Sequence, residues 1–496
     1  MAVENRFNLV DEQWIPVAGH GLVSLKEIFE RQDLSALGGN PVQKIALMKL
    51  LLAIAQSAYT PKDEDDWEQL GADGLAEKCR QYLKDNKDLF WLYGEKPFLQ
   101  MPAIVKAETQ SLGALQTYVA TGNTTVLTQI QVEKEADDVE KTLLVLQAMS
   151  FALGGKKTDN KVVLTKGYRG KTNEKGKAST GKPGPSIGYL GFLHSFLTGL
   201  NLQESIWLNL MTKSDIKGMK QFVEGVGVAP WENMPLGEDC LIARKLKNSY
   251  MGRLVPLSRF VLLAGDNIHY SEGILHPGYA EGMADLSVTV DFSKAKPKVI
   301  WTDIDKRPWR QLTALLSFFE SGRQQQFDCQ QLRIGIKRSK KYVNQFGVWS
   351  GGLRVSANAG EQYVSGHNDI IESEIKLKTA YLGEIWFANL KREMEQLESI
   401  SKNLYGAVNG FFRVQKTDGK EQAKLAVNLF WQLCERKFQY LVDCCALENT
   451  VIELKKIRKN FAGYVNKAYD TYCPKETARQ LDAWAASKPN LSKYLA

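Results

Sequence analysis

The residue types that could support catalysis are few and scattered along this sequence. Its five histidines form no HExxH or H-x-x-x-H pair, and no GxSxG, Walker A or strand-linked GxGxxG motif is present. Asp303 and Asp305 could hold a divalent cation at a strand end, with His269 and His276 as further ligands. One hypothesis is therefore a metal-dependent nuclease or nucleotide-processing enzyme. The alternative is that these residues are structural.

The seven cysteines give no metal-binding pattern. Only Cys444 and Cys445 are neighbours, and no C-x-x-C pair exists that could bind zinc. We expect buried structural thiols, no zinc site and no cofactor.

The strongest charge feature is the glycine-rich segment 154–188. The chain has 496 residues, with 64 Lys+Arg against 56 Asp+Glu, a net charge of +8. This segment holds nine Lys/Arg, two acids and eight glycines, a net charge of +7. Glycines let backbone N–H groups approach a nucleic-acid groove, and lysines neutralise phosphates. A DNA-binding loop and a solvated disordered loop on a structural interaction protein both fit this composition.

A second basic run precedes a predicted hairpin. Residues 332–338 alternate in a strand-like way, and residues 348–355 lead to the turn-like stretch 356–360, which predicts a hairpin with a small polar tip. A hairpin with basic flanks can present its tip to a DNA groove. Lysines that protect an exposed edge strand explain the same pattern equally well. The basic residues are Arg333, Lys337, Arg338, Lys340 and Lys341.

The helices and strands expected from the sequence indicate an α+β fold, with a large mixed α/β N-terminal domain. Ser24 and Glu27 form a capping box for a helix to Arg31, and Pro41 begins an apolar helix to about Tyr59. Apolar spacing predicts further helices over 139–153, 188–212 and 309–319, and strands over 7–10, 14–17, 260–263, 286–292 and 299–302.

After residue 368 the sequence changes to helical stripes. One stripe runs from Leu377 and Tyr381 to Leu397, a second from Leu425 to Cys445, and a third from Leu454 to Tyr472. With a fourth segment near 477–484, the pattern predicts an antiparallel four-helix bundle. We therefore expect one domain over 1–368 and a second over 369–496.

The apolar stretches are too short or too interrupted for a signal peptide or a membrane span. The N-terminus has no apolar core, and Lys49 interrupts the most apolar later stretch. We expect a soluble, cytoplasmic protein that does not associate with membranes.

The order of several short motifs resembles a known family, the large subunit (CasA) of the type I-E CRISPR Cascade. The resemblance covers nearly the whole chain, including the helical C-terminal part. It is carried by the residues 7–17, 44–58, 96–100, 154–155, 200–202, 208–210 and 351–354.

The resemblance implies a non-catalytic subunit of an RNA-guided antiviral complex. Such a subunit recognises the protospacer-adjacent motif (PAM) in double-stranded DNA, mostly from the minor groove, and promotes duplex opening and R-loop formation. It also helps to recruit the helicase-nuclease. The implied partners are the crRNA-containing backbone, 5′-handle-binding and small subunits, the target duplex and the helicase-nuclease.

The resemblance also implies roles for individual residues. A hairpin wedge comprises Arg354, Ser356, Ala357 and Asn358, with Asn358 at the tip where the family has Gln. His269, with Asn267 beside it, stands where the family inserts a lysine into the groove. The remaining implied sites are a DNA-binding glycine loop of Gly154, Gly155, Lys156 and Lys157, DNA-backbone contacts from Lys337, Arg338, Lys340 and Lys341, and a guide-contacting loop with Leu127, Gln129 and Gln131.

Overall fold

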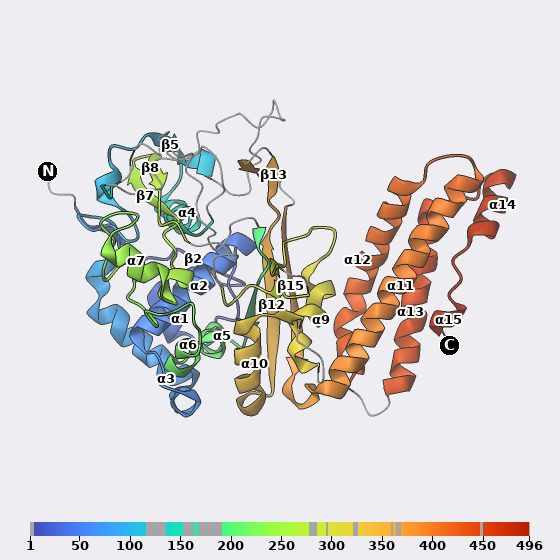
Figure 1. Ribbon diagram of the computed structural model, residues 1–496, viewed down its shortest axis with the longest axis horizontal. Helices are drawn as coiled ribbons and strands as arrows, with labels where there is room; N and C mark the ends of the chain where they lie inside the picture. Colours follow the sequence, from blue (N-terminus) through green and yellow to red (C-terminus); the bar gives the residue numbers. More distant parts are fainter. Residues whose placement is uncertain are drawn as a thin grey trace. The chain divides into compact units, whose positions relative to one another are not determined.

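The computed structural model divides the chain into two compact units, which we describe separately (Figure 1). The first unit comprises Met1–Pro308 and Gln326–Glu374, and the second comprises Trp309–Gln325 and Ile375–Ala496. Within these limits the structure describes residues 4–115, 135–151, 162, 164–166, 191–276, 285–293, 296–320, 326–358, 361–363, 369–446 and 450–495.

The N-terminal segment follows its predicted pattern. Strand β1 (Arg6–Asn8) pairs with β4 (Trp91–Tyr93), and β2 (Ile15–Val17) pairs with β3 (Gly21–Val23). Ser24 caps the N-terminus of helix α1 (Leu25–Glu30): its side chain accepts from the backbone N–H of Glu27, and the Glu27 carboxylate accepts from the N–H of Ser24. The predicted capping box is thus confirmed, and it fixes where α1 begins.

The core of the first unit forms around α2 (Pro41–Ala58), which is buried on all sides. It packs against α3 (Glu64–Asp85), α4 (Asp138–Ser150), α5 (Leu202–Asn209) and β12 (Gln345–Leu353). Lys49, in the middle of α2, donates to both carboxylate oxygens of Asp285 at 2.8 and 2.7 Å, and each side chain is only 2% exposed. The lysine that interrupts this apolar stretch is therefore neutralised inside the core rather than exposed.

Two three-stranded sheets lie at or next to the candidate site residues. The first has the order β15-β12-β6, with β15 (Ile370–Lys378) and β6 (His194–Thr198) flanking β12. The second has the order β5-β8-β7, with β5 (Thr109–Ser111), β8 (Asn267–Glu272) and β7 (Arg259–Ala264). The predicted apolar helix over 188–212 is wrong in its first half. The stretch from His194 to Thr198 pairs with Gly347–Gly351 as a buried strand, and the helix begins only at Leu202.

The predicted strand at 332–338 is also wrong, because this stretch lies in helix α10 (Gln330–Tyr342). Its buried residues recur at helical spacing: Gln331, Leu332, Gly335, Ile336, Arg338 and Ser339. Any side chain at Gly335 would collide with Leu197 of β6 and press on the backbone of α5. The alternating pattern of the sequence suggests a strand, but the close packing of Gly335 against β6 and α5 favours a helix.

The remaining elements of the first unit are short. The third sheet has the order β10-β9-β11, and β13 pairs with β14. The strands are β9 (Val290–Asp291), β10 (Lys298–Val299), β11 (Phe327–Asp328), β13 (Ser356–Asn358) and β14 (Glu361–Tyr363), and the helices are α6 (Lys213–Lys217), α7 (Leu241–Lys247) and α8 (Met251–Leu254).

The second unit consists mainly of helices. Helices α11 (Glu384–Val414), α12 (Lys420–Cys444) and α13 (Thr450–Tyr472) pack on one another, with the shorter α14 (Ala478–Ser487) against α11 and α15 (Ser492–Leu495) against α13. The segment from Trp309, with α9 (Leu312–Leu315), also packs here, because the Trp309 ring contacts Phe438 of α12 with 4.4 Å between ring centroids. The predicted first stripe begins too early, since Leu377 lies in β15.

No helix in the described ranges has the length and apolar character needed to cross a bilayer.

Candidate nucleic-acid interface

The turn between β7 and β8 presents the predicted groove-contacting residues. Ala264 pairs with Asn267, so Gly265 and Asp266 form a two-residue connection, in which Gly265 has a φ of +63° that favours glycine. Asn267 is exposed, whereas His269 is half-buried between Leu262 of β7 and Thr109 of β5. A short strand pair with a tight turn therefore holds Asn267 and His269 on a rigid support.

The imidazole of His269 is already fixed by one hydrogen bond. Its Nδ1 lies 2.8 Å from the backbone oxygen of Ala107. A carbonyl oxygen only accepts, so Nδ1 carries the proton and donates it. In the neutral form, Nε2 is then left as an acceptor rather than as a second donor. His269 in its neutral form therefore offers a hydrogen-bond acceptor, whereas the lysine found at this position in the family would offer only donors.

Below the turn, a charge pair ties the β7–β8 connection to helix α4. The ammonium of Lys141 lies 3.1 Å from the Asp266 carboxylate. Lys141 is almost buried, whereas the Asp266 carboxylate is largely exposed. The contact therefore places a neutralised acid, not a free cation, beside Asn267.

A short described stretch of the glycine-rich segment is anchored by a buried acid. Glu238, which is 1% exposed, accepts hydrogen bonds from the backbone N–H groups of Leu164 at 3.0 Å and Thr165 at 3.1 Å. The backbone N–H of Asp239 approaches the Thr165 hydroxyl at 3.4 Å. Lys166 follows with an exposed side chain that makes no ion pair within the described ranges. The carboxylate thus binds the backbone and leaves the neighbouring cation exposed.

A second, half-buried acid, Glu272 of β8, lies close enough to Glu238 for their charges to interact. Burial raises the pKa of Glu272 to about 7, the Arg259 guanidinium opposes that rise, and the Glu238 charge adds to it. Arg259 and Glu272 face each other in the β7–β8 pairing. Glu238, which anchors Leu164 and Thr165, therefore interacts electrostatically with Glu272 in the sheet that carries His269. Glu238 carries no signal in the sequence, because a single acid in a loop has no characteristic spacing.

A hairpin forms at the predicted place, from β13 and β14, but the predicted turn-like stretch 356–360 is wrong over Ser356–Asn358, which is strand because it pairs with β14. Ser356 pairs with Tyr363, Ala357 with Gln362 and Asn358 with Glu361. This register places the connection at positions 359 and 360, which lie outside the described residues. Ser356, Ala357 and Asn358 are thus strand residues that lead to the tip, with Asn358 at the last paired position.

Arg354 closes the base of this hairpin. Its guanidinium bonds the carboxylate of Asp369, a residue with a buried side chain, and its backbone N–H donates to the Asp369 carbonyl at 2.6 Å. Because these bonds join the two chain segments that flank β13 and β14, Arg354 supports the wedge from below. A contact with phosphate would compete with Asp369 for the same guanidinium.

The basic residues of α10 lie at the other end of β12. The nine residues of β12 at about 3.3 Å each carry the chain roughly 30 Å from the end of α10 to the hairpin base. In Figure 1, β13 stands at the upper edge of the first unit and α10 extends toward its lower edge. The predicted basic flank of the hairpin is therefore a separate surface.

The four predicted phosphate contacts on α10 differ in their environment. Arg338 is 3% exposed, donates to the carbonyl of Leu210 at 2.9 Å and pairs with Asp215, so in this structure it is a buried structural residue rather than a phosphate contact. Lys341 pairs with Glu64. Lys337 and Lys340 are exposed and make no ion pair with any described residue.

Several predicted site residues cannot be placed. The glycine-loop residues Gly154, Gly155, Lys156 and Lys157 and the guide-contacting residues Leu127, Gln129 and Gln131 lie outside the described residues. Their roles stay predictions.

The residues considered for metal catalysis do not come together. Among the described residues, no group of three or more His, Cys, Asp or Glu side chains is placed to hold a metal ion. Asp303 accepts from the backbone N–H of Asp305 in a tight turn. His276 is buried between Arg253 and the Pro256 carbonyl, and burial together with the Arg253 charge lowers its pKa to about 3. Each of these residues has a local structural partner.

The described chain is thus a mixed helix-and-strand protein whose candidate site consists of strand turns and loop anchors. Comparisons with known proteins agree on its class. The profile of the family described as CRISPR-associated protein Cse1 matches residues 8–468. The chain therefore belongs to the Cse1 family, also named CasA, and this confirms the resemblance to the large subunit of type I-E Cascade.

Individual proteins share part of the sequence or the fold of this chain. The CRISPR-associated protein CasA/Cse1 of Thermus thermophilus is 32% identical over 165 residues, which is 30% of this chain and 32% of that protein. The sequence alignment therefore spans about a third of this curated relative. The crystal structure of Thermus thermophilus CasA aligns with a TM-score of 0.73 at 19% identity, covering 99% of both chains. A chain of a solved CRISPR RNA-guided surveillance complex aligns at 0.67 and 15% identity, covering 97% of this chain and 98% of that one. These alignments show a shared fold.

Proposed function

We propose that this protein is a non-catalytic DNA-recognition subunit of a type I-E Cascade. It recognises the PAM in double-stranded DNA, mainly from the minor groove, and promotes duplex opening and R-loop formation. The single observation that carries this proposal is the Cse1 family match over residues 8–468. Guide pairing then supplies most of the sequence specificity, so the protein needs to read only a short motif.

Three surfaces divide this work in the proposal. The glycine loop with Lys156 and Lys157 approaches the groove and neutralises phosphate, and the exposed Lys166 and the Glu238 anchor support that role. The β13–β14 hairpin acts as the wedge, supported by the Arg354–Asp369 pair at its base. Separation of bases by a wedge costs a few kcal/mol per step, so a braced hairpin suits this role.

His269 acts as the groove-reading residue, with Asn267 beside it. Because Nδ1 donates to Ala107, the neutral ring offers Nε2 as an acceptor. In the minor groove only the guanine amino group is a donor, whereas the adenine, thymine and cytosine groups there accept. We therefore expect neutral His269 to favour a G·C pair, and exposed Asn267 to supply the amide donor that an A·T pair needs.

The proposed partners follow from the same assignment. The protein assembles with the crRNA-containing backbone, 5′-handle-binding and small subunits in the cytoplasm, and the loop with Leu127, Gln129 and Gln131 contacts the guide end. The fold shared with a chain of a surveillance complex supports this assembly. The bound complex then recruits the helicase-nuclease. Lys337 and Lys340 on α10 form a separate surface that could contact DNA backbone farther from the motif.

Selection from a randomised library tests the proposal. The complete complex, loaded with a known guide, is incubated with duplexes that share one target and carry random flanking bases, and the bound fraction is sequenced. We expect enrichment of a short motif next to the target, and His269→Ala should relax the preference at one position. Equal recovery of all flanks would overturn the proposal.

A further inference from the structure

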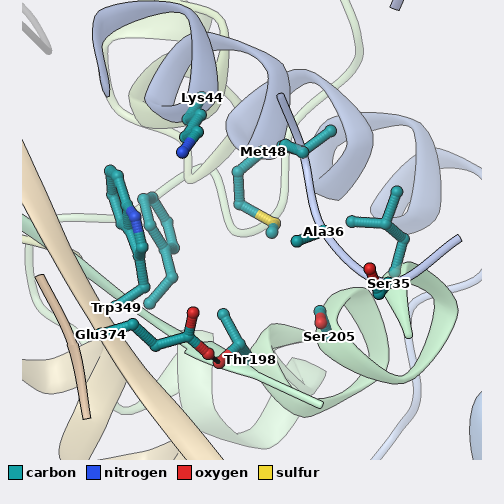
Figure 2. A pocket seen from close by; sticks show the side chains of 11 residues that line it. Ser35, Ala36, Lys44, Met48, Thr198, Ser205, Trp349 and Glu374 are labelled. Atoms are coloured by element: carbon teal, nitrogen blue, oxygen red, sulfur yellow. Dashed lines mark hydrogen bonds between the residues drawn. The ribbon is translucent and has the colours of Figure 1, made fainter. Parts of the chain in front are cut away.

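The first unit contains a small pocket, lined by none of the residues assigned above, with a volume of about 70 Å³ (Figure 2). Its lining comes from α2, α5, β6, β12, β15 and the loop around Ser35. At about 10–15 Å³ for each water in such a cavity, it has room for roughly five to seven water-sized groups. This space suits the end of one long side chain and is too small for a nucleotide.

One wall of the pocket is aromatic and apolar. The rings of Phe196 and Trp349 stack with 6.2 Å between centroids and 28° between planes, and both are buried. Met48 of α2 directs its sulfur toward the centre of the pocket in Figure 2, and Leu202 of α5 is part of the lining. A flat group with an apolar stem would keep these contacts and expel water.

The charges around the pocket leave one acid without a cation. Lys44 donates to both carboxylate oxygens of Glu372 at 2.9 and 2.8 Å, and the indole N–H of Trp349 donates to the same carboxylate at 2.8 Å. Glu374 instead accepts only from the Thr198 hydroxyl at 2.7 Å and makes no ion pair with any described residue. The side chains of Lys44, Glu372 and Glu374 therefore carry a net charge of −1, and Glu374 is the acid without a cation among the described residues.

The strand arrangement holds Glu374 in this position. Gly347 of β12 pairs with Thr198 of β6, and a Cβ at Gly347 would collide with both the Thr198 hydroxyl and the Glu374 carboxylate. The missing side chain thus leaves the space across which Glu374 reaches Thr198. The Glu374 side chain is exposed, and its hydrogen bond to Thr198 holds the carboxylate at the mouth of the pocket.

We propose that this pocket binds an arginine side chain presented by a partner protein. The guanidinium would pair with Glu374 and stack on the Trp349 and Phe196 wall, and its methylene stem would contact Met48. Lysine lacks the flat group that stacks, and a nucleic-acid phosphate would be repelled by Glu374. That the partner belongs to the same complex rests on the proposed function, whereas binding of arginine by the pocket does not.

The first test uses the isolated full-length chain and N-acetyl-arginine methylamide as the probe, followed by saturation-transfer NMR. A ligand of this size is expected to bind with a Kd on the order of a millimolar. We expect the uncharged citrulline analogue to bind at least fivefold more weakly. Glu374→Gln, which keeps an oxygen for Thr198, should weaken arginine binding by a similar factor, and Glu12→Gln at an exposed site should not.

Two further variants separate the pocket from the charge alone. Ala36→Leu fills the pocket without changing charge, and Gly347→Ala displaces the Glu374 carboxylate. Both should abolish arginine binding, while the thermal unfolding of each variant reports whether the chain is folded. Equal binding of arginine and citrulline, or unchanged binding by Glu374→Gln, would overturn the proposal.

The second test identifies the occupant in the assembled complex. A photoreactive benzoylphenylalanine replaces the exposed Ser35 at the pocket, and cross-linked peptides are identified by mass spectrometry. We expect a peptide of another subunit with an arginine at the cross-linked site, and loss of that cross-link in Glu374→Gln. A cross-link within this chain, to a segment without arginine, or none, would contradict the partner assignment. DNA selection by the same complex remains an independent readout of the proposed function.

Discussion

Two basic regions of the first unit, helix α10 and the segment at 164–166, differ in what their neighbouring acids bind. On α10, acids meet cationic side chains, since Asp215 pairs with Arg338 and Glu64 pairs with Lys341. At Leu164 and Thr165, the buried acid Glu238 binds backbone N–H groups, and the adjacent Lys166 stays exposed. A run of basic residues therefore becomes a basic surface only where the nearby acids have other partners.

The largest effect is expected at Arg338, where the α10 region is structural. Arg338→Met leaves Asp215 without its cation and removes the bond to the Leu210 carbonyl, so the free energy of unfolding should fall by about 2–3 kcal/mol. The loss is smaller than for a fully buried ion pair because the Asp215 side chain is 22% exposed. Chemical denaturation measures the change.

Lys340→Ala on the same helix serves as the control for Arg338→Met. It should change the free energy of unfolding by less than about 0.5 kcal/mol. If both variants lost a similar free energy of unfolding, Arg338 would contribute no more to stability than the exposed Lys340, and its structural role would be wrong.

The next largest effect is expected at Glu238. Glu238→Ala removes the acceptor of two backbone N–H groups, so the amides of Leu164 and Thr165 should exchange with solvent roughly tenfold faster or more. Hydrogen exchange with mass spectrometry measures this directly. Glu232→Ala, at an exposed acid whose partner is the Tyr82 hydroxyl, is the matched control. Unchanged exchange at both amides would show that Glu238 does not anchor the segment.

A smaller effect is expected from Arg354 at the base of the hairpin. Arg354→Ala should weaken opening of the duplex by the assembled complex about fivefold, because the wedge loses its pair with Asp369. Fluorescence of 2-aminopurine next to the flanking motif reports the opening. Lys337→Ala, at the other end of β12, should leave the signal unchanged. The reverse pattern would move the DNA contact to α10.

The smallest effect concerns Glu272 and pH. Its pKa in the folded protein is about 7, against 4.5 for an ordinary glutamate, so the native state binds this proton more tightly than the unfolded chain does. The contribution of Glu272 to stability is therefore present at low pH and is lost as pH rises from about 4.5 through about 7. Glu272→Gln should raise the Tm at pH 8 and not at pH 4. An equal change at both pH values would contradict this assignment.

Much of the framework follows from local sequence signals. The capping box at Ser24, the proline at the start of α2 and the hairpin after Gly351 were predictable because each depends on neighbouring residues. Residues 332–338 and 194–198 were not, since their structure depends on packing against distant elements. The role of Glu238 could not be predicted either, because its partners lie more than 70 positions away. The bond from His269 to Ala107 likewise depends on a third strand, β5.

The salt dependence of DNA binding shows directly whether the glycine loop, rather than α10, contacts DNA phosphates. The assembled complex is titrated with target duplex at several salt concentrations, with Lys156→Ala/Lys157→Ala and Lys337→Ala/Lys340→Ala as a matched pair of double variants. We expect the Lys156/Lys157 double variant to lower the slope of log affinity against log salt by about one to two, and the Lys337/Lys340 double variant to change it less. An unchanged slope for the first double variant and a reduced slope for the second would contradict this expectation.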